Sequence, residues 1–465
     1  MRYEMCNATK TKVLFNMSDS QNIISRIPNN GKPRVIIIGG GFAGIQLVKS
    51  LSGTDVQVVM LDRNNYHTFQ PLLYQVATAG LEPDSVAGPL RKVFDNQKNF
   101  FFRMAEVEYV DADQQSVITN IGTLSYDYLV IATGTRTNFF GNKNVERLSF
   151  PLKQVPQALN LRSHILQNFE KAVLLEDEEE KNRLTNFVVV GGGPTGVEVS
   201  GALGELKKHV LPRDYPEFNF DLMKIYLVEG KNEVLSGMSE NASKRAQQDL
   251  ENKFHVQVNL NSMVEDFDGY EVKMKDGRTI PTETLIWAAG VKGVIIPGLT
   301  RAQEEQSRYV VDEYNRVDGY DNVFAIGDVA KMKAREYPEG HPQVAPVAMQ
   351  MGTHLGKNIG RMLRNEEMKP FSYFDKGTMA TIGRNRAVVD MPTRVHFGGT
   401  LAWLIWMFVH LLYIIGFRNK LVIFSNWIWN YFTYDRGTRL IIRPFDYRRF
   451  ISDKSRKIEE ATTWD

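Results

Sequence analysis

Two glycine-rich turns carry a residue pattern that can bind dinucleotides. Residues 39–44 read Gly-Gly-Gly-Phe-Ala-Gly, and residues 191–196 read Gly-Gly-Gly-Pro-Thr-Gly. The first glycine permits a tight turn, the third lets the backbone approach a pyrophosphate, and the last lets a helix pack closely on a strand. The following helix offers unpaired N–H groups to the phosphates. The predicted phosphate-binding residues are Gly39, Gly41, Phe42, Ala43 and Gly44, then Gly191, Gly193, Pro194, Thr195 and Gly196.

An acidic residue follows each turn, at the end of the next apolar segment. Asp62 lies eighteen residues after Gly44, and Glu229 directly follows the apolar residues 225–228. A carboxylate at this place can accept hydrogen bonds from the ribose of an adenosine. Because Glu229 would repel a 2′-phosphate, the second turn favours NADH over NADPH.

Short apolar strands must position both turns. The β-branched run 35–38 precedes the first turn and residues 187–190 precede the second, as expected of buried parallel strands. Three further segments, 128–134, 285–290 and 323–328, each end in small residues or an aspartate. They add the candidate cofactor-binding residues Ala132, Thr133, Gly134, Ala289, Gly290, Gly327 and Asp328.

The order of these segments predicts an α/β fold with two Rossmann-like dinucleotide-binding domains, the first interrupted by the second. Two such folds indicate two bound nucleotides. The alternative is one working site and one degenerate copy. Asp328 could hold a ribityl chain or a phosphate.

Composition narrows the chemistry further. The 465 residues are 43% hydrophobic and 24% charged, which excludes disordered and fibrous classes, and the net charge of +2 argues against a nucleic-acid partner. The single cysteine, Cys6, excludes a disulfide framework, a dithiol redox centre, a cysteine-ligated zinc site and an iron–sulfur cluster. Redox chemistry would therefore need a bound organic cofactor, and no metal site is predicted.

Over residues 34–440 the chain resembles the flavoproteins with two dinucleotide-binding domains, and most closely the type II NADH:quinone oxidoreductases. Residues 65–77, which include Gln70, look like the loop that runs past the flavin. Residues 133–141 look like the family's extended Ala-Thr-Gly turn, and residues 345–350 resemble its quinone-site motif. The resemblance implies FAD in the first fold, NADH in the second, and a membrane quinone (ubiquinone or menaquinone) as acceptor, without proton pumping.

The same resemblance suggests roles for single residues. Glu198 matches a family glutamate that could position nicotinamide or relay protons, although an early-turn glutamate also simply favours the helix dipole. Lys376 matches a lysine beside the flavin, the alternative being a solvated loop lysine. The helix opening at Ala345 could stabilise charge on the reduced flavin. Gln350 closes the quinone motif, whereas Pro346 stands where the family has glutamine. The catalytic candidates are thus Glu198, Lys376 and Gln350.

The C-terminal part predicts two amphipathic helices. Residues 401–415 are apolar except for His410, and a polar stripe crosses residues 421–434. A membrane-spanning helix needs ~20 apolar residues, and residues 401–415 are too few for that. We therefore expect a monotopic anchor on the cytoplasmic side of the cell membrane. The alternatives are a hairpin packed on the protein's own core, a dimer interface, and a single span over 398–417. The residues expected to share one face are Trp403, Trp406, His410 and Tyr413 in the first helix, and Asn426, Asn430 and Thr433 in the second.

The predicted organisation follows from these segments. It comprises a flexible leader at 1–33, FAD-binding segments at 34–150 and 299–393, a connecting helical region at 151–184, an NADH-binding domain at 185–298, and the anchor with its basic tail at 394–465. Two other functions fit: a soluble NAD(P)H:ferredoxin or diaphorase-type reductase with a dimerising tail, and a non-catalytic flavoprotein redox sensor. A homodimer is left open.

Overall fold

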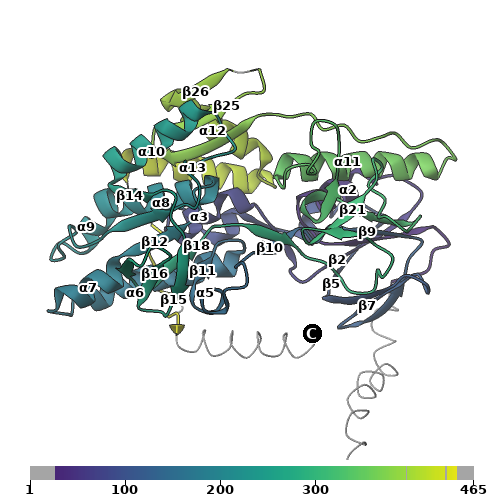
Figure 1. The fold of residues 1–465 in the computed structure, drawn as a ribbon. Coiled ribbons are helices and arrows are strands. Elements are labelled where there is room, and N and C mark those ends of the chain that lie inside the picture. The colour runs from purple at the N-terminus through teal and green to yellow at the C-terminus, as the bar shows by residue number, and fades with distance from the viewer. Residues whose placement is uncertain (1–26, 394, 435–436, 443, 448–465) are drawn as a thin grey trace, which may run out of the picture. The chain divides into compact units, whose positions relative to one another are not determined.

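The computed structural model describes residues 27–393, 395–434, 437–442 and 444–447 (Figure 1). Cys6, Arg436, Arg443 and most of the predicted leader lie outside these described residues. The chain divides into two compact units. The first comprises Met1–His67, Pro89–Arg136 and Lys292–Phe374, and the second comprises Thr68–Gly88, Thr137–Val291 and Asp375–Asp465.

The first unit is built on a parallel five-stranded sheet in the order β22-β9-β1-β2-β5. Its central strands are buried on both faces, which is why they read as continuous apolar runs. The strands are β1 (Arg34–Ile38), β2 (Gln57–Asp62), β5 (Phe100–Met104), β9 (Tyr128–Ile131) and β22 (Val323–Ala325). Strand β22 follows all strands of the second sheet in the sequence, yet it pairs with β9 in the first sheet. The predicted interruption of the first fold by the second is therefore confirmed.

Two helices of the first unit pack tightly against each other. They are α2 (Phe42–Ser50) and α11 (Ala345–Met362). A Cβ atom on Gly352 would lie 2.2 Å from the Ala43 carbonyl oxygen, so the absence of a side chain there permits the close approach. Smaller sheets surround this core: β6 (Val107–Asp111), β7 (Ser116–Thr119) and β8 (Gly122–Ser125) form one, and β20 (Glu304–Glu305), β21 (Arg308–Val311) and β23 (Ala330–Met332) form another.

The second unit contains a parallel sheet in the order β11-β18-β12-β13-β14. The strands are β11 (Phe150–Pro151), β12 (Phe187–Val190), β13 (Ile225–Val228), β14 (Val256–Asn259) and β18 (Thr284–Trp287). The principal helices are α6 (Val155–Ala172), α7 (Glu178–Thr185), α8 (Pro194–Glu205) and α10 (Glu240–Phe254). An antiparallel sheet of β15 (Val264–Phe267), β16 (Glu271–Met274) and β17 (Thr279–Pro281) adds Phe267 and Val272 to the same core.

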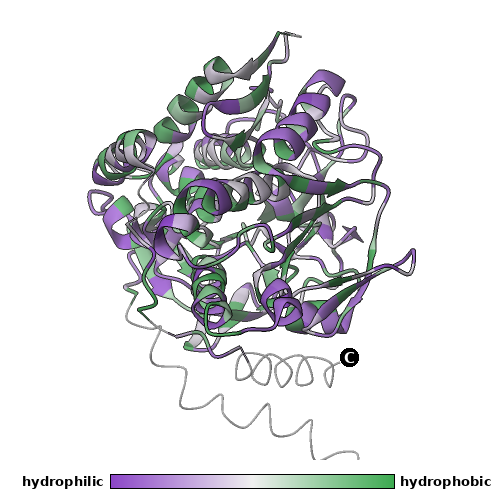
Figure 2. Cartoon of the chain, turned by 90° about the vertical axis from the view of Figure 1, so that its left-hand side faces the viewer, coloured by the Kyte–Doolittle hydropathy of each residue, from purple (hydrophilic) through white to green (hydrophobic). Residues whose placement is uncertain are grey.

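The C-terminal part of the second unit is a three-stranded antiparallel sheet followed by two helices. The elements are β24 (Thr378–Gly383), β25 (Arg386–Asp390), β26 (His396–Gly399), α12 (Thr400–Tyr413) and α13 (Phe417–Thr433). In Figure 2, α12 lies near the top of the view and is largely green, that is, apolar. Within the described ranges, no helix combines the length and the apolar character that crossing a bilayer requires.

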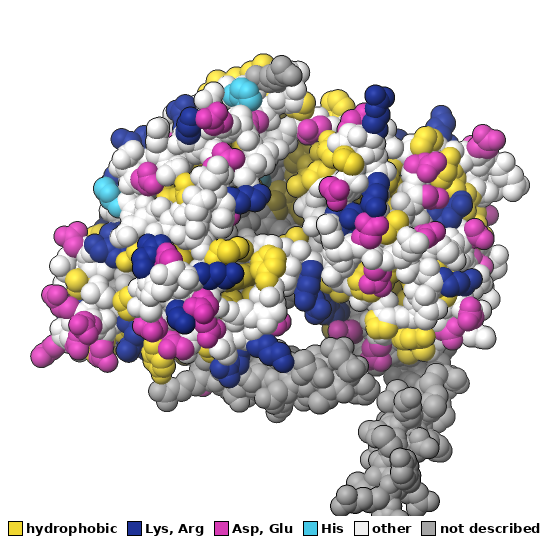
Figure 3. Space-filling model, viewed as in Figure 1, with side chains coloured by type: hydrophobic (Ala, Val, Ile, Leu, Met, Phe, Trp, Pro, Cys, Tyr) yellow, Lys and Arg dark blue, Asp and Glu magenta, His cyan; other side chains and the backbone are white. Residues whose placement is uncertain are grey.

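One local expectation needs revision, and two neighbouring segments show how the chain continues. The second tail helix begins at Phe417 rather than 421, so Arg418 and Lys420 lie in its first turn. After α8 the chain continues as a π-helical turn (Leu206–Val210) and α9 (Leu211–Asp214), because Pro at the start of a helix is compatible with helical geometry. The acidic run 176–180 forms the exposed start of α7, capped by Asp177, and Figure 3 shows acidic side chains gathered over that helix.

Candidate functional site

The first glycine turn forms an open cradle at the C-terminal end of β1. Gly39 has a φ of +113°, and a Cβ atom there would lie 2.3 Å from the Ala132 carbonyl oxygen. A Cβ on Gly44 would lie 2.0 Å from the Gly39 oxygen, whereas one on Gly41, at the start of α2, would meet nothing within 4 Å. Two glycines are therefore required by packing, and the third leaves room for a ligand at the helix N-terminus.

Asp62 lies beside this cradle at the end of β2. Its carboxylate accepts the Gly40 N–H at 2.6 Å and the Asn64 N–H at 2.7 Å. Burial raises the pKa of Asp62 and outweighs these two hydrogen bonds, which favour the charged form. His67 is buried next to the same turn. Its Nδ1 lies 3.0 Å from the Gly40 backbone oxygen, and burial lowers the pKa of His67 to about 4.

The remaining candidates of the first unit gather at the same edge of its sheet. Thr135 Oγ1 donates to Asp328 Oδ2 at 3.2 Å, and Thr133 Oγ1 donates to the Val294 oxygen at 2.7 Å. A Cβ on Gly327 would lie 3.1 Å from Ala43 Cβ. Ala345 is the first residue of α11, which packs on α2. Backbone N–H groups, two carboxylates and small residues from five segments thus line one edge, an arrangement that could bind a dinucleotide.

The second glycine turn repeats this geometry in the second unit. A Cβ on Gly196 would lie 1.8 Å from the Gly191 oxygen, and one on Gly191 would lie 2.9 Å from the Ala288 oxygen. Gly193, at the start of α8, is again open. Glu229 Oε2 accepts the Gly192 N–H and Oε1 accepts the Lys231 N–H at 2.8 Å, in the place that Asp62 takes in the first unit.

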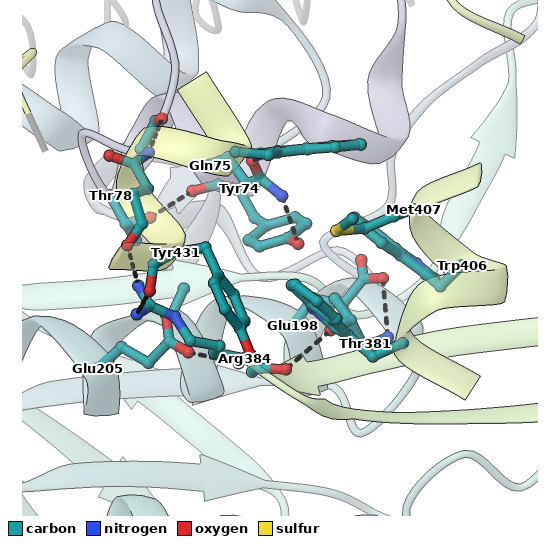
Figure 4. A pocket seen from close by; sticks show the side chains of 16 residues that line it. Tyr74, Gln75, Thr78, Glu198, Glu205, Thr381, Arg384, Trp406, Met407 and Tyr431 are labelled. Carbon is teal, nitrogen blue, oxygen red and sulfur yellow. Dashed lines mark hydrogen bonds between the residues drawn. The ribbon is translucent and has the colours of Figure 1, made fainter. Parts of the chain in front are cut away.

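A separate pocket of about 100 Å³ lies between α8, β24 and the two C-terminal helices of the second unit (Figure 4). Its walls are strongly aromatic, with a few polar groups that converge on it. The aromatic members are Tyr74, Trp403, Trp406, Trp427 and Tyr431, and the polar members include Gln75, Glu198, Glu205, Thr381, Arg384 and Asn430. A cavity in which aromatic rings and convergent polar groups share the lining can hold a small molecule.

Glu198 is the buried acid of this pocket. Glu198 is 7% exposed, and its Oε1 accepts the Thr381 N–H at 3.4 Å. Burial raises the pKa of Glu198 to about 8, although the Thr381 N–H and the nearby Trp406 indole both favour the charged form. Glu198 is therefore largely protonated at neutral pH and can act as a hydrogen-bond donor or a proton source.

Helix α13 turns polar side chains toward the body of the second unit. Asn426 donates to Glu82 at 2.8 Å, Trp427 Nε1 donates to Gln75 at 2.9 Å, and Asn430 donates to the Gly80 oxygen at 3.3 Å. The outward-facing sides of both C-terminal helices are apolar and exposed. They present Leu404, Phe408 and Leu412 on α12, and Leu421, Phe424, Ile428, Trp429 and Phe432 on α13.

The expected shared face of α12 is directed inward. Trp406 is 1% exposed, and the ring of His410 stacks on it with the ring centroids 4.1 Å apart. His410 Nδ1 lies 2.7 Å from the Trp406 oxygen, and burial lowers the pKa of His410 to about 4, so this histidine is packed and neutral. Trp403 stacks on Tyr431 of α13 at 5.6 Å.

Three further candidates lie apart from the pocket lining. Lys376 is exposed and donates to the Tyr413 hydroxyl at 2.9 Å. The Gln350 side chain accepts the Phe374 N–H and donates to the Phe374 oxygen, each at 2.9 Å, so its amide pairs with backbone. Gln70 is exposed at the start of a 3₁₀ turn (Gln70–Leu72) in the second unit.

The sequence reasoning missed the residues that complete the pocket. Thr381 and Arg384 follow Lys376 in the chain but carry no recognisable motif, and Tyr74 lies within the resembling loop without standing out. The one available signal was the spacing of Trp403, Trp406 and His410, which places polar-tipped rings on one face.

Family models and curated relatives match most of this chain. The family model described as pyridine nucleotide-disulphide oxidoreductase matches residues 33–352, and the model described as NDH2 C-terminal domain matches residues 376–434. The chain is similar to the type II NADH:quinone oxidoreductase Ndh of Mycobacterium tuberculosis, at 36% identity over 90% of this chain and 92% of the relative. It is 34% identical to NdhA of the same organism, over 90% of this chain and 92% of the relative.

Solved structures show the same fold. The structure of NDH2 from Plasmodium falciparum in complex with NADH superposes with a TM-score of 0.81, at 21% identity, over 89% of this chain and 100% of that one. The sulfide:quinone oxidoreductase of Aquifex aeolicus superposes with a TM-score of 0.66, at 20% identity, over 86% of this chain and 95% of that one.

Proposed function

The chain belongs to the type II NADH:quinone oxidoreductases. From that premise we propose which of its residues bind FAD, NADH, the quinone and the membrane. The protein is a FAD-dependent enzyme that oxidises NADH and reduces a quinone without proton pumping. We propose that segments 34–150 and 299–393 hold FAD and that segment 185–298 holds NADH, as their glycine turns and acids indicate.

The first unit fits FAD. The open space at Gly41, the N-terminus of α2 and the Asp62 carboxylate offer what a pyrophosphate and a ribose need. When bound, FAD supplies the chemistry of accepting a hydride and passing two electrons to the quinone. Asp328 and the N-terminus of α11 at Ala345 complete the proposed cofactor edge.

In the second unit, we assign NADH to the crevice at Gly191, Gly193 and Gly196. Glu229 would accept hydrogen bonds from the adenosine ribose and repel a 2′-phosphate. The N-terminus of α8 would face the pyrophosphate, because Gly193 leaves space there.

We propose that the aromatic pocket around Glu198 receives the quinone. Quinone carbonyls accept hydrogen bonds, and their reduction consumes protons. Glu198 holds a proton at neutral pH because burial raises its pKa to about 8. The aromatic walls contributed by α12 and α13 suit an apolar ring and its isoprenoid tail. Gln350 and Lys376 stay candidates for contacts with quinone and flavin.

The observation that carries the membrane proposal is the exposed apolar side that both α12 and α13 turn outward. In a helix on a water-facing surface the apolar side faces the core, whereas here polar side chains of α13 bond to residues 75–82 and apolar side chains face outward. Phe408 is 63% exposed, Trp429 61% and Phe432 78%. A contiguous exposed apolar face of this kind fits an interfacial anchor, which we place on the cytoplasmic side of the cell membrane.

Vesicle flotation tests this proposal. Replacing Leu404, Phe408 and Leu412 together by Gln removes apolar side chains from one exposed face of α12 without opening the core. We expect the triple variant to lose vesicle binding and turnover with a long-chain quinone embedded in the vesicles, while NADH oxidation by a water-soluble acceptor persists. Leu174→Gln, at a residue that is 83% exposed in the turn between α6 and α7, is the control. Unchanged vesicle binding of the triple variant would show that this face of α12 does not carry the anchor, and absence of vesicle binding by the wild-type protein would support the soluble-reductase alternative.

A further inference from the structure

Phe140 holds an exposed aromatic ring in a strained backbone conformation. Its φ is +51°, in the left-handed region that side-chain-bearing residues rarely adopt, and the residue is 69% exposed. A network of hydrogen bonds fixes this conformation. Asn138 Oδ1 accepts the Phe140 N–H at 2.9 Å. The backbone oxygen of Asn138 accepts the Nε1–H of Trp287 at 2.8 Å. Strain of this kind persists where the surrounding structure enforces it, often at binding sites.

The ring of Phe140 lies directly against Gly290. A Cβ atom on Gly290 would come within 2.6 Å of Phe140 Cζ, and the φ of Gly290 is +68°. The Asn138 N–H also donates to the Gly290 oxygen at 3.3 Å. Glycine at position 290 therefore makes room for the ring, and the ring stands beside the small-residue turn that follows β18.

This turn borders the proposed NADH crevice. A Cβ on Gly191 would lie 2.9 Å from both the Ala288 oxygen and Ala289 Cα, so the turn and the glycine-rich loop touch. Phe140 thus lies beside a turn that itself touches the loop where the pyrophosphate would bind.

The strand order identifies which half of the dinucleotide lies there. In the order β11-β18-β12-β13-β14, β13 is added on one side of β12 and β18 on the other, so β12 marks the switch point of the sheet. A dinucleotide crosses such a switch point with one half on each side. Glu229, at the end of β13, marks the adenosine side. The end of β18, where Gly290 and Phe140 lie, is therefore on the nicotinamide side.

We propose that Phe140 is a binding residue for the nicotinamide half of NADH, its ring forming an aromatic wall against the nicotinamide and its ribose. The inference rests on the proposed NADH site in the second unit. An exposed ring held in place by its backbone loses little side-chain entropy when a ligand ring packs on it, so it contributes affinity and orientation together.

Isothermal titration of the FAD-loaded protein with NAD⁺ and with ADP-ribose tests this inference. ADP-ribose lacks the nicotinamide but keeps the adenosine and the pyrophosphate. We expect Phe140→Ala to weaken NAD⁺ binding about three- to tenfold and to leave ADP-ribose binding unchanged, with Phe140→Tyr close to wild type. In steady-state assays the KM for NADH should rise while the KM for the quinone stays the same.

Tyr270→Ala is the matched control, because Tyr270 is another exposed ring of the second unit, 55% exposed, and packs beside Arg183 instead. Equal weakening of both ligands by Phe140→Ala would mean that the loop merely supports the site, and would overturn the inference. Unchanged NAD⁺ binding would overturn it as well. If the wild-type protein bound neither ligand, the NADH site itself would be misplaced, which distinguishes failure of the premise from failure of the inference.

Discussion

The Glu229 carboxylate accepts the backbone N–H of Gly192, the middle glycine of the second glycine-rich turn. The bond fixes the acid at the rim of the crevice, where the 2′ position of an adenosine ribose would lie. The Gln side chain keeps an oxygen that can accept the same N–H but carries no charge. We therefore expect Glu229→Gln to lower the KM for NADPH roughly tenfold, ~1.4 kcal/mol, and to raise the KM for NADH. Parallel kinetics with both coenzymes measure this, with Glu233→Gln in the same loop as the control. A variant that still rejects NADPH would contradict the assignment.

Two glycines of the first turn should respond differently to alanine. A Cβ on Gly41 meets no protein atom within 4 Å, so Gly41→Ala should leave the melting temperature of the apoprotein unchanged while lowering the flavin-to-protein ratio of the purified enzyme. A Cβ on Gly44 would lie 2.0 Å from the Gly39 oxygen, so Gly44→Ala should destabilise the fold itself. Thermal unfolding together with flavin absorbance separates the two effects. Normal flavin content in Gly41→Ala would argue against a pyrophosphate at that position.

Glu198 should make the stability of the protein pH-dependent. The folded state holds its proton up to a pKa of about 8, whereas the unfolded chain releases it near 4.5, so the free energy of unfolding falls as the pH rises between these values. Glu198→Gln removes this dependence. We expect the variant to be more stable than wild type at pH 8, by up to about 4 kcal/mol, and the difference to vanish near pH 4.5.

Thermal melts of Glu198→Gln at a series of pH values check this expectation. Glu178→Gln, in the exposed first turn of α7, serves as the control and should follow the wild-type curve. Parallel curves for Glu198→Gln and wild type would show that Glu198 ionises normally. If Glu198 also supplies a proton to the quinone, turnover of the variant with quinone should fall more than NADH oxidation by a one-electron acceptor.

Arg384 should control the attachment of α13. Its guanidinium donates to the backbone oxygens of Asn430 and Tyr431 at the end of that helix and lies over the Tyr434 ring, 3.4 Å from the centroid. Replacing it by Gln removes charge-assisted hydrogen bonds and a cation–π contact, which we expect to cost about 2–3 kcal/mol. Limited proteolysis should then cut near residue 430 faster than in wild type.

Arg418 provides the comparison for Arg384. It makes an exposed ion pair with Asp84 at 3.6 Å, and pairs of this kind contribute little to stability. Arg418→Gln should therefore melt and digest like wild type. Similar sensitivity in both variants would mean that positive charge in general, rather than the bonds of Arg384, holds α13 in place.

The glycine turns, their strands and the acids Asp62 and Glu229 could be predicted because all of them depend on local chain geometry. The spacing of Trp403, Trp406 and His410 also predicted that these rings share one face of α12, but not that this face points into the protein. The pocket was not, because it joins residues such as Tyr74, Glu198 and Arg384 that meet only through tertiary packing. The early start of α13 at Phe417 also escaped prediction, since basic residues in its first turn oppose the helix dipole.

Helix α8 joins two sites within one rigid element. Its N-terminus borders the glycine turn, and Glu198 lies four residues past Pro194, a rise of about 6 Å along the helix axis. Gly201 seats the same helix against β24, since a Cβ there would lie 1.7 Å from the Ile382 oxygen. Glu198 and the N–H groups beside the glycine turn are thus held at a fixed spacing by one helix.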